Sequence, residues 1–108
     1  MVFTSRVDDK FRPVDRLERA SLQQEHIVLF VRWFDVGFGD VPFRCEIRDG
    51  SGELIDVQEM TGHPKSTTWQ TSTRHRFNRV VDQPGRWLFR VYLKGVLAVE
   101  APLEVAAE

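Results

Sequence analysis

Few side chains in this sequence are of the kinds that bind metals or perform nucleophilic catalysis. The three histidines, His26, His63 and His75, are far apart, and none has a histidine or cysteine neighbour at metal-site spacing. The sequence also contains no GxSxG motif and no glycine-rich loop that leads into a helix. We therefore expect no metal, no cofactor and no catalytic residue, and a protein that is not an enzyme.

The single cysteine, Cys45, alternates with the apolar residues Phe43 and Ile47. This pattern predicts a small buried core residue and not a reactive thiol. One cysteine cannot form an intramolecular disulfide, which is compatible with a reducing compartment. No secretory signal and no apolar segment long enough to span a bilayer is present, so we expect a cytoplasmic protein without membrane contact.

Arginine is the residue type that most favours a binding function, since the chain has 12 arginines and 3 lysines. Arg74, Arg76, Arg86 and Arg90 fall on outward positions of two expected strands that follow one another, with Tyr92 on the same side as Arg90. If these strands pair, they form one basic face. Such a face could bind phosphate, nucleic acid or an acidic protein through bidentate contacts.

A second interpretation of the arginines is that acidic residues on neighbouring strands, such as Glu46 and Glu59, pair with them on a solvated sheet. The sequence leaves both interpretations open. The net charge of −1 gives no overall attraction to a polyanion. If the arginines bind a partner, we therefore expect an acidic protein in preference to nucleic acid.

Trp69 stands out among the aromatic residues because it lies, with Lys65, in the polar segment of residues 61–72. We expect this segment to be the longest mobile loop and the first candidate for recognition. An exposed tryptophan often anchors a sugar or a protein. Equally, Trp69 could fold back and cap the end of the domain. The candidate binding residues are Trp69, Lys65, Arg74, Arg76, Arg86, Arg90 and Tyr92.

The elements that must position these residues are short strands, because apolar and polar residues alternate along most of the chain. Residues 11–20 fit either a short strand or one helical turn. We expect strands over residues 1–7, 25–34, 41–48, 53–60, 73–81, 87–92 and 96–105.

Residues 25–34 form the strongest expected strand, and both of its faces are apolar at the centre. We expect a loop, the N-terminal segment or a partner to cover the second face. The glycine-containing segment of residues 35–40 predicts a turn, and thus a hairpin between residues 25–34 and 41–48.

Length and composition fit one small domain spanning residues 1–108, with 42% hydrophobic and 29% charged residues. Seven to eight short strands with turns every 8 to 12 residues are typical of an all-β, two-sheet antiparallel sandwich. Strand count and spacing do not separate this fold from a small closed barrel.

Three sequence segments together carry a family resemblance. Residues 82–105 contain a Pro-Gly turn, an aromatic strand, a Lys-Gly turn and a final strand that includes Ala101-Pro102-Leu103-Glu104-Val105. Residues 48–55 contain an Asp-Gly hairpin, and residues 11–15 contain a Phe-Pro-Asp segment. These segments resemble parts of bacterial immunoglobulin-like sandwich modules of the short intracellular type. The resemblance covers around half of the chain. It implies an immunoglobulin-like sandwich but no particular activity.

The sequence is therefore best interpreted as a non-enzymatic protein-interaction or accessory module, with a protein partner or a second copy of itself. The alternative is a sandwich that binds a carbohydrate or another small ligand. That alternative requires an exposed Trp69 with a second aromatic residue beside it.

Overall fold

A computed structural model describes residues 1–108 and contains eight strands and no helix. No helix is long and apolar enough to cross a membrane. The strands are β1 (Val2–Thr4), β2 (Arg19–Ser21), β3 (His26–Phe34), β4 (Val41–Arg48), β5 (Leu54–Gly62), β6 (Thr68–Arg76), β7 (Gly85–Leu93) and β8 (Val96–Ala106). The helical turn considered for residues 11–20 is absent, and β2 forms at the end of that segment.

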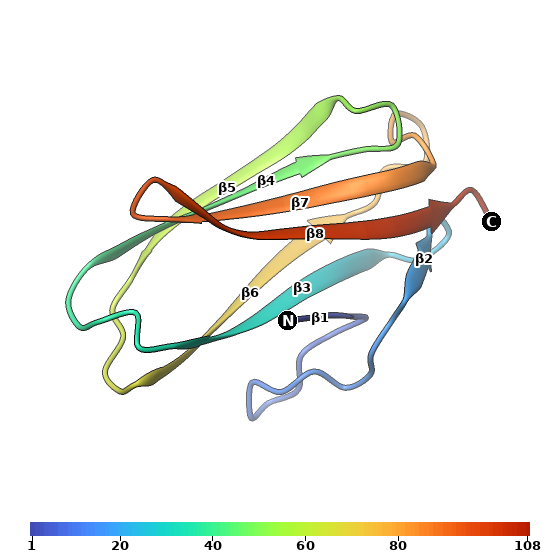
Figure 1. Ribbon diagram of the computed structural model, residues 1–108. Coiled ribbons are helices and arrows are strands. Elements are labelled where there is room, and N and C mark those ends of the chain that lie inside the picture. Colours follow the sequence, from blue (N-terminus) through green and yellow to red (C-terminus); the bar gives the residue numbers. More distant parts are fainter.

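The strands form two sheets that pack as layers (Figure 1). The small sheet has the order β1-β3-β6, and the large sheet has the order β2-β8-β7-β4-β5. All pairs are antiparallel except β2 with β8, which is parallel. The all-β, two-sheet prediction is confirmed, but the large sheet is mixed and not purely antiparallel.

The core lies between the sheets, where alternate side chains of each strand point inward. Phe43 and Ile47 of β4 and Trp87 and Phe89 of β7 are almost completely buried. Cys45 is also fully buried, as its alternation with Phe43 and Ile47 predicts. Burying these apolar side chains is the main favourable contribution to folding.

The hairpin expected between residues 25–34 and 41–48 is wrong. β3 belongs to the small sheet and β4 to the large sheet, so the two strands do not pair. Residues 35–40 carry the chain from one layer to the other, with positive φ at Asp35, Gly37 and Gly39. Both strands bury an apolar face, and placing them in opposite layers lets each cover the other.

The long mobile loop expected over residues 61–72 is also wrong. β5 extends to Gly62 and β6 begins at Thr68, so only residues 63–67 connect them. The first half of β6 is a strand despite its polar composition, and its inner positions are occupied by the buried threonines Thr71 and Thr73. Trp33 Nε1–H donates a hydrogen bond of 3.0 Å to Thr71 Oγ1, which satisfies a polar group within the core.

Residues 5–18, here called the N-terminal strap, cover the second apolar face of β3. The ring of Phe11 lies 5.7 Å from that of Phe30, which is 5% exposed. Asp15 fixes the strap, because its carboxylate accepts hydrogen bonds from the Thr4 hydroxyl (2.6 Å), the Ser5 backbone N–H (2.8 Å) and the Ser5 hydroxyl (2.6 Å). Of the three covers expected for the second face of β3, a loop, the N-terminal segment or a partner, the structure shows the N-terminal segment.

Candidate functional site

The single basic face that Arg74, Arg76, Arg86 and Arg90 would form if their strands paired is absent. These residues lie on β6 and β7, which follow one another in the sequence but belong to different sheets. Because residues 77–84 carry the chain across the sandwich, Arg74 and Arg76 lie on the outer face of the small sheet. Arg86 and Arg90 lie on the outer face of the large sheet, with Tyr92.

Acidic side chains pair with arginines on the outer face of the large sheet. Arg90 Nε lies 3.0 Å from Glu100 Oε2. Arg44 is bound twice, with Nη2 at 2.7 Å from Glu46 Oε2 and Nη1 at 3.3 Å from Glu59 Oε1. For Arg44 and Arg90, the second interpretation is therefore confirmed: these arginines pair with acidic side chains on a solvated sheet.

The same face contains a groove around Tyr92, with a volume of about 670 Å³. This volume is within the range of about 300 to 1,000 Å³ found for ligand pockets. A β-bulge between Val91 and Tyr92 interrupts the pairing of β7 with β8, and such bulges often redirect a side chain beside a binding site. The groove is lined by Pro42, Phe43, Arg44, Glu46, Glu59, Met60, Thr61, Tyr92 and Gly95.

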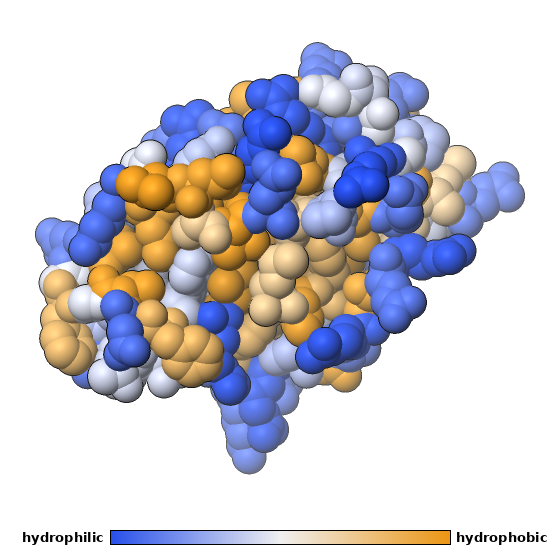
Figure 2. All heavy atoms as spheres, viewed as in Figure 1, coloured by the Kyte–Doolittle hydropathy of each residue, from blue (hydrophilic) through white to orange (hydrophobic).

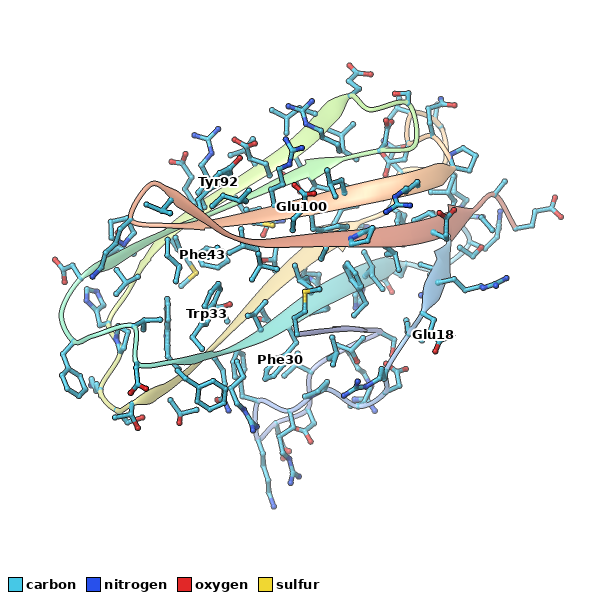
Figure 3. All side chains as sticks on the ribbon, viewed as in Figure 1. Glu18, Phe30, Trp33, Phe43, Tyr92 and Glu100 are labelled. Atoms are coloured by element: carbon cyan, nitrogen blue, oxygen red, sulfur yellow. The ribbon has the colours of Figure 1, made fainter.

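Exposed apolar side chains gather at the same end of the molecule as the groove. Figure 2 shows hydrophobic atoms at the left end, where the loop after β3, the loop after β5 and the β7–β8 turn come together. Figure 3 shows Tyr92 pointing away from the small sheet, whereas Phe43 and Trp33 lie between the sheets. The exposed apolar residues of this end are Phe34, Phe38, Met60, Val96 and Leu97.

Trp69 is half-buried in β6 and packs against the hydrophobic core. Its ring lies 6.5 Å from that of its strand partner Trp33, and a Cβ at Gly62 would collide with it. Trp33 is buried, so the pair fills the end of the sandwich and does not form an open aromatic platform. Lys65 is exposed in the connection between β5 and β6.

The outer face of the small sheet carries three exposed arginines, Arg32 on β3 and Arg74 and Arg76 on β6. No side chain on this face of either strand is a carboxylate. Sequence reasoning missed Arg32, although it occupies an outward position beside Trp33. It also did not place Met60, Glu46 and Glu59 around Tyr92, because only strand pairing brings them together.

A buried polar cluster joins the edge strands β5 and β6. His75 Nδ1 lies 3.2 Å from Asp56 Oδ2, and His75 Nε2 lies 3.0 Å from Asp82 Oδ2. The His75 ring thus bridges the two carboxyl groups. Gln58 Nε2–H also donates to the Arg74 carbonyl at 2.7 Å. These contacts link the two sheets along one side.

Neither the histidine nor the cysteine of this region is available for chemistry with a substrate. His75 is 7% exposed, with both ring nitrogens occupied, and its ring packs against Trp87. Burial raises the pKa of the Cys45 thiol to about 12, far from the range of reactive thiolates. No group of three or more His, Cys, Asp or Glu side chains is placed to hold a metal ion.

Comparisons with known proteins assign no family to this arrangement. No protein-family model matches the chain, and no curated protein matches it significantly. The function must therefore be argued from the surfaces themselves.

Proposed function

We propose that this chain is a non-enzymatic interaction module that holds a protein partner in the groove around Tyr92. The observation that carries the proposal is an open groove bordered by an aromatic ring and exposed apolar side chains. Tyrosine, methionine and arginine, which line it, are enriched where protein interfaces become fully buried.

The fixed geometry of the groove supports this proposal. Arg44 is held between Glu46 and Glu59, so its guanidinium has little freedom to lose when a partner docks. Leu97, the strand partner of Tyr92, is 47% exposed, and Val96 beside it is 67% exposed. A partner that inserts an apolar side chain between Tyr92 and Leu97 would remove this apolar surface from water.

A small-ligand site is the second candidate, and the composition of the groove favours it specifically. The ring of Tyr92 offers a face on which a sugar can stack, and the polar groups of Arg44, Glu46, Glu59 and Thr61 can form hydrogen bonds with its hydroxyls. Trp69 contributes less to this candidate than its sequence context predicts, because its ring packs on Trp33 and the Gly62 backbone.

The test compares three proteins with the wild type. Leu97→Asp places a charge at the apolar rim, Tyr92→Ser removes the aromatic ring, and Val80→Asp is the matched control. Val80 is 88% exposed in the connection between β6 and β7, away from the groove. A partner isolated by affinity capture and then purified is titrated calorimetrically against each protein.

We expect Leu97→Asp and Tyr92→Ser to weaken partner binding by roughly tenfold or more, and Val80→Asp to leave it unchanged. Equal binding by Tyr92→Ser, Leu97→Asp and the wild type would refute the groove as the docking surface. A glycan that binds the wild type but not Tyr92→Ser, followed by intrinsic fluorescence, would favour the small-ligand candidate.

Kinship with bacterial immunoglobulin-like modules is part of the same proposal. Its support is the strand order, in which β1-β3-β6 and β8-β7-β4-β5 resemble the A-B-E and G-F-C-C′ arrangements of immunoglobulin sandwiches. We also place the protein in the cytoplasm within this proposal, since its only cysteine is a buried free thiol and suits a reducing compartment.

A further inference from the structure

The open part of the small sheet's outer face carries positive charge without negative charge. Its outward side chains on β6 are Thr68, Gln70, Ser72, Arg74 and Arg76, and on β3 the uncovered ones are Arg32 and Phe34. Arg32, Arg74 and Arg76 are here called the arginine strip. The strip is separate from the Tyr92 groove, which lies on the other sheet.

The guanidinium groups of the strip have no partner within the protein. None of the three makes an ion pair, and none donates a side-chain hydrogen bond, although Arg12, Arg44 and Arg90 do both. The nearest acidic residues along β3 are Glu25 and Asp35, which lie just beyond its two ends. Each guanidinium therefore keeps its donors free for a planar acceptor such as a carboxylate.

The strip also has a defined length and direction. Arg74 and Arg76 are two residues apart on one strand, a separation of about 6.6 Å along it. Arg32 pairs with Gln70, so the strip extends about 20 Å from Arg76. The exposed ring of Phe34, opposite Thr68, follows at the Arg32 end. The order along the face is thus two arginines, a neutral polar stretch, one arginine and an apolar ring.

We propose that the arginine strip binds an acidic protein segment in extended conformation. Carboxylates two residues apart in such a segment share one side and match the spacing of Arg74 and Arg76. A further carboxylate meets Arg32, and an apolar side chain beyond it contacts Phe34. Arginine suits this role because its fork binds a carboxylate through two parallel hydrogen bonds.

A nucleic acid fits this surface less well. The strip offers only three cations, and the net charge of −1 gives no long-range attraction to a polyanion. Phe30 lies between the arginines but is covered by Phe11, and the exposed ring of Phe34 lies beyond Arg32, so no free aromatic ring lies between the arginines to stack a base.

The experiment measures binding of a fluorescent peptide of alternating glutamate and serine that ends in leucine, at low salt, by anisotropy. Its counterpart with glutamine in place of glutamate is the peptide control. The proteins are the wild type, the double variant Arg74→Gln/Arg76→Gln, and the control Arg19→Gln/Arg86→Gln. The control removes the same charge from two exposed arginines of the large sheet, which flank Glu104.

We expect the wild type and the control to bind the acidic peptide alike, and the strip variant to bind it roughly tenfold more weakly. Arg32→Gln should give a smaller loss, and the glutamine peptide should not bind. Equal loss in both double variants would show unspecific attraction and overturn the proposal, as would absence of wild-type binding. Tighter binding of a single-stranded oligonucleotide of equal charge would also overturn it. Thermal melts verify that each variant folds.

Discussion

The outer faces of the two sheets differ in how many of their arginines have an acidic partner. On the large sheet, Arg44 and Arg90 each contact a glutamate of a neighbouring strand. On the small sheet, Arg74 and Arg76 face β3 positions that carry Val28 and His26, and neither arginine makes an ion pair. Arg44 and Arg90 are thus neutralised on the large sheet, although Arg19 and Arg86 make no ion pair there, whereas every arginine on the open face of the small sheet is left available. The pairing of strands, and not the number of arginines, decides which surface can attract an anion.

A second difference between the faces is what covers them. The large sheet's outer face is open to solvent, whereas the strap turns part of the small sheet's outer face into core at Val28 and Phe30. Only β6 and the end of β3 that carries Arg32 and Phe34 are left for a partner on this face. The strap therefore sets the width of the arginine strip.

The largest expected effect is a loss of stability at Phe30, which tests whether the strap covers β3. Phe30→Ala should lower the free energy of unfolding by about 3 kcal/mol, because it leaves a cavity beneath Phe11. Leu88→Ala, on the half-buried outer face of β7, should cost about 1 kcal/mol, since less area is lost there. Urea unfolding of both variants provides the comparison. Equal losses would show that the strap does not add Phe30 to the core.

The next effect concerns the attachment of the strap. Hydrogen bonds from the side chains of Ser5 and Thr4 and from the Ser5 backbone N–H hold the pKa of Asp15 below its ordinary value of 3.8. The unfolded chain therefore takes up the proton first as pH falls. The stability that Asp15 contributes is complete well above pH 3.8 and is lost as pH falls through its lower folded-state pKa.

We expect Asp15→Asn to lower the free energy of unfolding at pH 7 by about 1 kcal/mol and to reduce the further loss between pH 5 and about pH 3. Urea midpoints at several pH values measure both effects. Asp9→Asn is the matched control, since that strap carboxylate accepts no side-chain hydrogen bond. A pH profile of Asp15→Asn parallel to that of the wild type would show that Asp15 does not hold the strap.

The sequence predicted the architecture well where the alternation of residues was clear. The inner residues Phe43, Cys45 and Ile47, and likewise Trp87 and Phe89, are buried as their spacing indicated. The connection made by residues 35–40 was not predictable, because a glycine-rich turn can either close a hairpin or carry the chain to the other layer. The polar threonine and glutamine side chains of residues 68–72 predict a loop, whereas in the structure Thr71 is buried and accepts a hydrogen bond from Trp33.

The candidate sites were less predictable for a related reason. Each outward arginine could be identified from alternation, but its neighbours come from other strands. Glu59 reaches Arg44 only because β4 pairs with β5, and Glu100 reaches Arg90 only because β7 pairs with β8. A single sequence contains no direct record of these pairings. Because β6 and β7 belong to different sheets, their arginines lie on two opposite faces of the molecule and do not form one basic face.

The smallest expected effect separates the two kinds of arginine directly. Arg44→Ala should lower the free energy of unfolding by about 0.5 kcal/mol at low salt, because Glu46 and Glu59 lose their shared partner and repel each other. Salt should weaken this effect by screening exposed charges. Arg74→Ala should lower the free energy of unfolding by less, or raise it slightly. Arg74 makes no ion pair that the substitution could break, and its removal ends the repulsion between its charge and that of Arg76. Urea unfolding at low and high salt measures both. If both variants lost the same salt-dependent stability, Arg74 would have an acidic partner in solution, and the arginine strip would not be free to bind one from another protein.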